Sequence, residues 1–97
     1  MKIIWSPLAI EKASEIADYI AKDKPSAAEE WLNTLFAKVE RLEASPKIGR
    51  KVPEINSELF RELIYGNYRI IYRIAKDQLA ILTIHHGKQL LIADTLD

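Results

Sequence analysis

Apolar residues recur at helical spacing through most of the first half of the chain, which predicts two α-helices. Ser6 and Pro7 are typical of a helix start, as the N-cap residue and the first helical residue. The first helix is expected to end near residues 22–24, because the residue before Pro25 is disfavoured in helical geometry. A second apolar stripe follows within residues 26–45.

The second helix carries start and stop signals of its own. Ser26 and Glu29 have the spacing of a capping box, in which each residue satisfies a free backbone N–H group of the other. Ser45 and Pro46 are expected to close the helix. Because only a few residues join the two helices, we expect them to pack antiparallel as a helical hairpin.

The remaining apolar segments are short and rich in β-branched and aromatic residues, which predicts strands. The expected strands are residues 2–5, 59–65, 68–75 and 79–86. Residues 46–58 hold two prolines and a glycine and are expected to form an irregular, basic connection. The pattern predicts one α+β domain over residues 1–97, in the order β-α-α-β-β-β. The N-terminal strand joins the edge of a small, mainly antiparallel sheet, and the helical hairpin covers one face and leaves the other partly open.

The turn between the two central strands decides which side chains share a face of the sheet. A two-residue loop at Gly66–Asn67 puts Arg61 and Arg69 on opposite faces. A three-residue loop flips the second strand and brings Arg61, Arg69 and Arg73 together. The sequence leaves both registers open.

Composition narrows the classes of function. The chain has 97 residues and no cysteine, which excludes a disulfide scaffold, a thiolate metal site and a cysteine nucleophile. Fourteen basic residues balance fourteen acidic ones, so bulk electrostatic attraction to nucleic acid is not expected. There is no apolar run of membrane-spanning length and no recognisable signal peptide, so we expect a cytoplasmic protein without membrane contact.

The two histidines, His85 and His86, do not form a metal site on sequence grounds. Adjacent residues of a strand point to opposite faces, and no third ligand is suitably spaced. Neither a metal nor another cofactor is therefore expected. One of the two histidines could still exchange a proton near a phosphate group.

Residues 47–73 carry the richest chemistry, with six basic residues against three acidic ones. Arginines alternate there with aromatic residues, and a sheet surface of this kind suits RNA or an acidic protein partner. The structural alternative is cross-strand ion pairing, for instance of Glu62 with Arg69 or Arg73.

Several short motifs follow one another along nearly the whole chain. They are Ser6-Pro7-Leu8-Ala9, Ser45-Pro46 with Gly49-Arg50, Pro53, Phe60-Arg61-Glu62-Leu63, Tyr68-Arg69-Ile70-Ile71-Tyr72 and His86-Gly87-Lys88. This ordered set resembles the RelE/ParE superfamily of type II toxin–antitoxin toxins. The resemblance implies the α+β fold expected above and a cognate antitoxin as partner. Contact with promoter DNA would come only through that antitoxin.

One branch of this superfamily, the RelE-like toxins, cleaves mRNA on the ribosome. The catalytic residues that the resemblance implies for such a ribonuclease are Arg61, Arg69, His85 and His86. Leu63 and Gln89 stand where that branch prefers lysine or arginine. Loss of two positive charges near a scissile phosphate removes transition-state stabilisation, which weakens the ribonuclease hypothesis.

The two central strands and the His86-Gly87-Lys88 ending look closer to the ParE-like branch, whose members poison DNA gyrase and so block replication and growth. Gln89 departs from that branch, which often has a second basic residue there. The resemblance therefore favours a gyrase-inhibiting toxin that acts by binding. The ribosome and mRNA are the alternative target, and an inactive relic that only binds its antitoxin is a third hypothesis.

Two sets of binding residues follow from the resemblance and the sequence pattern. The expected target-binding residues are Arg61, Arg69, Tyr72, Arg73, His86 and Lys88. The expected antitoxin-binding residues are Trp5, Leu8, Ile16, Ile20, Trp31 and Leu35, some of which must fill the core instead. On this basis Arg69→Ala should lower toxicity and leave antitoxin binding largely intact.

Overall fold

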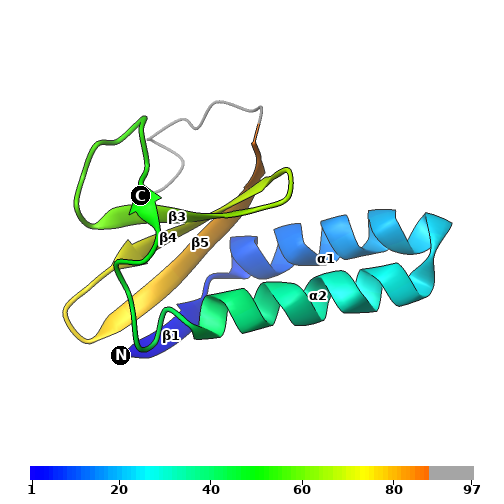
Figure 1. Ribbon diagram of the computed structural model, residues 1–97, viewed down its shortest axis with the longest axis horizontal. Coiled ribbons are helices and arrows are strands. Elements are labelled where there is room, and N and C mark those ends of the chain that lie inside the picture. Colours follow the sequence, from blue (N-terminus) through cyan, green and yellow to red (C-terminus); the bar gives the residue numbers. More distant parts are fainter. Residues whose placement is uncertain (88–97) are drawn as a thin grey trace.

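The computed structural model describes residues 1–87, which form two helices and a five-stranded sheet (Figure 1). The elements are β1 (Lys2–Trp5), α1 (Pro7–Asp23), α2 (Pro25–Glu40), β2 (Arg50–Lys51), β3 (Phe60–Tyr65), β4 (Tyr68–Ile74) and β5 (Gln78–His86). The strand order is β1-β5-β4-β3-β2, with β1 parallel to β5 and the other neighbours antiparallel. The expected α+β fold is confirmed, including the N-terminal strand at a sheet edge. The short strand β2 is an addition within the connection expected to be irregular.

Helix α1 begins and ends where the sequence predicts. The Oγ atom of Ser6 accepts a hydrogen bond from the Ala9 amide at 3.1 Å. The same hydroxyl donates to the Leu82 carbonyl at 2.7 Å, which ties the start of the helix to β5. The helix ends at Asp23, ahead of Pro25.

Helix α2 differs from its prediction at both ends. Pro25 is its first residue, and no side chain caps the helix. The capping box predicted for Ser26 and Glu29 is wrong, because Ser26 already lies inside the first turn. The helix ends at Glu40 and turns follow it, so the stop predicted at Ser45 is too late.

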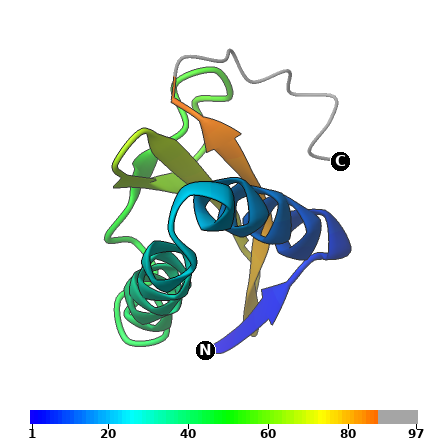
Figure 2. The same ribbon diagram turned by 90° about the vertical axis from the view of Figure 1, so that its right-hand side faces the viewer.

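Both helices pack on one face of the sheet (Figure 2). Helix α1 turns Ala9, Ala13 and Ala17 inward, and these small side chains let it lie close to its neighbours. The buried core on this face consists of Ala9, Ala13, Leu35, Val39, Leu42, Ile70, Tyr72, Leu79, Ile81 and Ile84. Neither helix within residues 1–87 has the length and apolar character needed to cross a membrane.

The turn between β3 and β4 has two residues, which settles the register. Gly66 has a φ of 57° as the first central residue of the turn, the position that favours glycine in a type II′ hairpin. Arg61 pairs with Tyr72, and Arg69 pairs with Ile64. Because Tyr72 and Arg69 are three residues apart on β4, Arg61 lies on the helix-covered face and Arg69 on the other.

The second face of the sheet is covered at its centre by the segment that follows β2. Val52 and Ile71 are fully buried there, and Ile55 and Phe60 pack against them. A β-bulge in β5 adds Leu82 to this small cluster. The face expected to be partly open is therefore open only around this second cluster.

Candidate functional site

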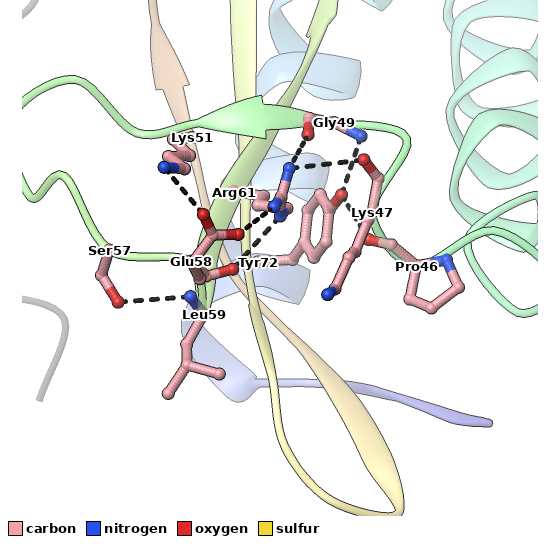
Figure 3. Close-up of polar contacts among 9 residues, drawn as sticks. All are labelled: Pro46, Lys47, Gly49, Lys51, Ser57, Glu58, Leu59, Arg61 and Tyr72. Atoms are coloured by element: carbon pink, nitrogen blue, oxygen red, sulfur yellow. Dashed lines mark hydrogen bonds and ion pairs between the residues drawn. The ribbon is translucent and has the colours of Figure 1, made fainter.

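Arg61 is bound into the protein and is not presented to a partner (Figure 3). Its guanidinium donates hydrogen bonds to the carbonyls of Glu58 at 3.2 Å and Gly49 at 2.9 Å, and it pairs with the Glu58 carboxylate at 2.8 Å. Only 11% of its side chain is exposed. Lys51 lies 2.8 Å from the same carboxylate, and its hydrogen bond, with the charges of Lys51 and Arg61, lowers the pKa of Glu58. Arg61 therefore joins the segments before and after β2.

Tyr72 is fully buried beneath the same connection. Its hydroxyl accepts a hydrogen bond from the Gly49 amide at 3.0 Å and donates one to the Pro46 carbonyl at 2.7 Å (Figure 3). Burial raises the pKa of this hydroxyl, so it stays protonated as a donor. The expectation that Tyr72 contacts a target is corrected here, because no part of the side chain reaches solvent.

Arg69 is the centre of an ion-pair network with Arg50, Glu54 and Glu62. Its Nε atom donates to Glu62 Oε1 at 2.8 Å, and its terminal nitrogens bind the two Glu54 oxygens at 2.8 and 2.7 Å. Arg50 binds the other oxygen of Glu62 at 2.7 Å. Hydrogen bonding to Glu54 raises the pKa of Arg69, which stays charged. The cross-strand pair considered for Glu62 and Arg69 is therefore present.

The two histidines point to opposite faces, as strand alternation predicts. His85 lies opposite Arg69, and its Nδ1 atom is buried without a hydrogen-bond partner within residues 1–87. Burial, and secondly the charge of Arg69, lower the pKa of His85. His86 lies opposite Tyr68, with the two rings edge to face at 5.8 Å. Within the same described range no three metal-ligating side chains come together.

A hollow opens at the end of the sheet where β3 turns into β4. Its volume is about 380 Å³. Its lining residues are Arg50, Ile64, Gly66, Asn67, Tyr68, Arg69, His86 and Gly87, and we call it the hairpin-end hollow. The Arg50 side chain is 60% exposed and supplies an accessible positive charge at its rim. Sequence reasoning missed Arg50 as a site residue, although it is one of the six basic residues of the 47–73 segment.

The expected target-binding residues are not brought together as one set. Arg69 and His86 line the hairpin-end hollow, but Arg69 is buried and paired. Arg73 is exposed near the opposite end of β4, with its guanidinium carbon 5.7 Å from the centre of the Phe60 ring. Lys88 lies outside the described residues. His86 is therefore the expected residue that remains at the hollow with a side chain not wholly buried.

The expected antitoxin-binding residues are divided between surface and core. Leu8 is exposed, and Trp5, Ile16, Ile20 and Trp31 are half-buried. Leu35 is fully buried in the main core, so its assignment to a binding groove is corrected. Exposed apolar side chains that the sequence analysis did not select include Ile10 and Phe36. The Phe36 ring meets Trp5 edge to face at 5.5 Å, which makes a continuous apolar surface from α2 to β1.

Comparison with known proteins identifies the family. A family model described as “ParE toxin of type II toxin-antitoxin system, parDE” matches residues 3–91. A Sinorhizobium fredii protein named “Putative toxin Y4kP” is 37% identical over 90 residues, which cover 91% of this chain and 90% of that protein. A chain of the solved structure “Chromosomal ParDE TA system from P. aeruginosa” has the same fold, with a TM-score of 0.75 at 20% identity over 91% of this chain and 97% of that chain. This chain therefore belongs to the ParE toxin family of type II toxin–antitoxin systems.

Proposed function

We propose that this toxin inhibits DNA gyrase by binding to it, and that a cognate antitoxin neutralises the toxin. Membership of the ParE toxin family supports the general role of a toxin, without specifying its target. The choice of gyrase over ribosome-bound mRNA is supported by one observation, which is that the cations expected for RNA cleavage do not converge. Arg61 and Arg69 lie on opposite faces of the sheet.

RNA cleavage requires an acid, a base and positive charges that meet at one phosphate group. The charges of Arg61 and Arg69 are already engaged by Glu58 on one face and by Glu54 and Glu62 on the other. His85 lies beside Arg69, on the face opposite to Arg61. Arg61 and Arg69 thus form structural ion pairs within the toxin, which suits a protein that acts through its surface.

The hairpin-end hollow is the surface that we propose for gyrase contact. It combines the exposed cation of Arg50 with the rings of Tyr68 and His86. Aromatic and arginine side chains contribute most often to the binding energy of protein interfaces. Arg73, which lies outside the hollow, and Lys88 remain proposed contacts. Arg61, Arg69 and Tyr72 act inside the fold, where they hold the segments before and after Arg50.

For the antitoxin we propose the apolar surface formed by Trp5 and Phe36, together with the exposed side chain of Leu8. Contiguous exposed apolar residues on a small protein mark a protein contact, and aromatic anchors there bury large areas. Ile16, Ile20 and Trp31 remain proposed contacts, because each is only half-buried. This surface includes residues of α1, α2 and β1, whereas the hairpin-end hollow is formed by β2, β3, β4 and the end of β5.

The test is a gyrase supercoiling assay on relaxed plasmid, with purified toxin alone and then with the antitoxin encoded beside it. We expect inhibition, trapped cleaved DNA and reversal by the antitoxin. His86→Ala should weaken inhibition by about fivefold or more, the effect of losing roughly 1 kcal/mol of binding energy. Lys76→Ala, an exposed change in the turn between β4 and β5, serves as the matched control and should inhibit like the wild type.

Other outcomes would contradict the proposal in distinct ways. Folded toxin that leaves gyrase active but produces a ribosome-dependent cleavage pattern on a reporter message would establish the RelE-like alternative. Folded toxin that does neither, yet binds the antitoxin tightly, would identify an inactive relic. Gyrase inhibition that His86→Ala and Lys76→Ala leave equally strong would exclude the hairpin-end hollow as the contact surface.

A further inference from the structure

Arg69 lines two cavities of the toxin surface. One is the hairpin-end hollow. The other has a volume of about 360 Å³ and is lined by Arg50, Pro53, Glu54, Arg69 and Gly87, and we call it the Glu54 cavity. Arg50 and Arg69 line both cavities, yet only 7% of the Arg69 side chain is exposed. A strong cation therefore lies close to solvent but is largely covered.

Glu54 occupies the terminal nitrogen atoms of Arg69. Its two carboxylate oxygens accept hydrogen bonds from them at 2.8 and 2.7 Å, the paired geometry in which a guanidinium also binds a carboxylate of another molecule. A second carboxylate on Arg69 comes from Glu62, whose side chain is completely buried. The Glu54 side chain is 20% exposed and lines a cavity, so it can leave Arg69 more readily than Glu62 can.

The segment that carries Glu54 is held in place by contacts of other residues. The Val52 amide donates to the Phe60 carbonyl at 3.1 Å, and Val52 and Ile55 belong to the small apolar cluster on the second face of the sheet. None of these contacts involves the Glu54 side chain. Rotation of that side chain would thus uncover the terminal nitrogens of Arg69 and leave the backbone in place.

The charges of the ion-pair network indicate what could replace Glu54. Arg50 and Arg69 balance Glu54 and Glu62, so departure of the Glu54 carboxylate leaves one excess positive charge. Among the described residues that line the two cavities, Arg50 and Arg69 are the only lysine or arginine residues. A nucleic-acid strand requires a series of cations for its phosphates, whereas a single excess charge suits one carboxylate of a protein.

We propose that Arg69, with Arg50 beside it, forms a carboxylate-binding site, which Glu54 occupies in the free toxin and an acidic side chain of the target protein occupies in the complex. Glu54 then acts as an internal competitor, which lowers the apparent affinity of the toxin for its target. The identification of that target as gyrase rests on the function proposed above, whereas the site itself does not. Arg69 thus stabilises the free toxin and contacts the target once Glu54 has moved.

The first test is chemical rescue by acetate, a carboxylate small enough to enter the space that Glu54→Ala leaves. The variant should lose about 5 °C in melting temperature, because Arg69 loses one of its carboxylates. Sodium acetate at about 0.2 M should restore roughly half of that loss, and sodium chloride at the same ionic strength should not. The wild type should gain nothing from acetate, because Glu54 already fills the site.

Glu58→Ala is the matched control for the rescue. Glu58 lies in the same connection and also pairs with an arginine, Arg61, at 2.8 Å. Arg61 keeps its hydrogen bonds to the backbone carbonyls of residue 58 and Gly49 in this variant, so its charge needs no replacement. Acetate should therefore leave the melting temperature of Glu58→Ala unchanged.

The second test measures inhibition in the gyrase supercoiling assay. Glu54→Ala should reach half inhibition at about fivefold lower concentration than the wild type, because the target no longer competes with an internal carboxylate. Glu54→Gln keeps the shape of the side chain without its charge and should show the same gain, so it provides the comparison if the alanine variant fails to fold. Glu58→Ala should inhibit like the wild type. A purely structural Glu54 predicts the opposite, since a less stable toxin would inhibit no better.

Three results would overturn the proposal. The first is a Glu54→Ala variant that acetate stabilises no more than the wild type, since no exchangeable carboxylate site would then exist. The second is inorganic phosphate that rescues this variant more strongly than acetate at equal ionic strength, which would assign the site to a phosphate group. The third is acetate rescue without stronger gyrase inhibition by either Glu54 variant, which would show that the target does not use the site. Wild-type toxin that leaves gyrase active would contradict the proposed function instead, and acetate rescue would still decide whether the site exists.

Discussion

Several charged residues of this toxin form ion pairs that stabilise the fold. Glu62 is almost completely buried, and the ion pairs that compensate its charge come from Arg50 and Arg69. A buried carboxylate without such partners costs several kcal/mol, of order 3–5 when one partner of a buried pair is removed. Arg69 therefore contributes to stability directly, and any effect of its loss on toxicity includes the effect on folding.

Arg69→Ala should lower the free energy of unfolding by about 3–5 kcal/mol, because Glu62 and Glu54 lose their shared partner. Urea denaturation followed by circular dichroism measures the change. Arg73→Ala on the same strand is the control, and since Arg73 is exposed its effect should stay within about 1 kcal/mol. Equal stability of Arg69→Ala and wild type would show that the ion-pair network makes no net contribution. The expectation that Arg69→Ala lowers toxicity and leaves antitoxin binding largely intact stays a prediction, to which this loss of stability is added.

At the scale of elements, the connection between α2 and β3 is fixed by contacts from β3 and β4. Arg61 and Tyr72 bind backbone groups of residues 46–49, and Gly49 fits only because it has no side chain. A Cβ atom added at Gly49 would lie 2.6 Å from both the Glu62 carbonyl oxygen and the Tyr72 hydroxyl. The connection that the sequence predicts to be irregular is thus held to the sheet by side-chain hydrogen bonds.

Tyr72→Phe should cost about 1–3 kcal/mol of stability, because the buried Gly49 amide and the Pro46 carbonyl lose the hydroxyl between them. The matched control is Tyr19→Phe, which removes the same atom from an exposed side chain and should change stability by less than about 0.5 kcal/mol. Thermal and urea unfolding of the two variants measure the difference. Indistinguishable losses in the two variants would contradict the role given to the Tyr72 hydroxyl.

The sequence predicted those elements that local patterns determine. The 3.6-residue period and Ser6 identify α1, and strand alternation places His85 and His86 on opposite faces. The sequence could not predict β2, because a strand of two residues is too short to show an alternating pattern. The sequence also left the register of β3 and β4 open, because the register depends on the length of the turn between them. The burial of Tyr72 and Leu35 is set by packing between distant segments, so it is visible only in the structure.

At the scale of the whole molecule, the two faces of the sheet differ in chemistry. The helix-covered face holds the large apolar core, and the other face holds the small Val52–Ile71 cluster beside the Arg69 ion-pair network. His85 lies opposite Arg69 in the sheet, and its side chain is also influenced by Lys12 of α1. Burial and these two charges therefore disfavour protonation of the His85 imidazole in the folded protein.

Stability should fall as the pH drops below about 6.5, in part because of His85. Burial, with the charges of Arg69 and Lys12 outweighing that of Glu54, lowers its pKa in the folded state. The unfolded chain therefore takes up the proton at a higher pH than the folded protein, and protonation favours unfolding. Urea midpoints measured from about pH 7.5 to 5.5 should decline less in His85→Gln than in the wild type. An identical decline in both would contradict this account.

The parallel pairing of β1 with β5 has a consequence for the order of events during synthesis. The Ser6 hydroxyl binds the carbonyl of Leu82, a separation of 76 residues, and Ile3 lies beside Leu79. Contacts between residues so far apart in the sequence form late, because the long loop between the two residues must close first. A nascent chain released only as far as residue 77 holds both helices but lacks the neighbour of its first strand. The sheet is therefore completed only after β5 has left the ribosome, well after both helices have emerged.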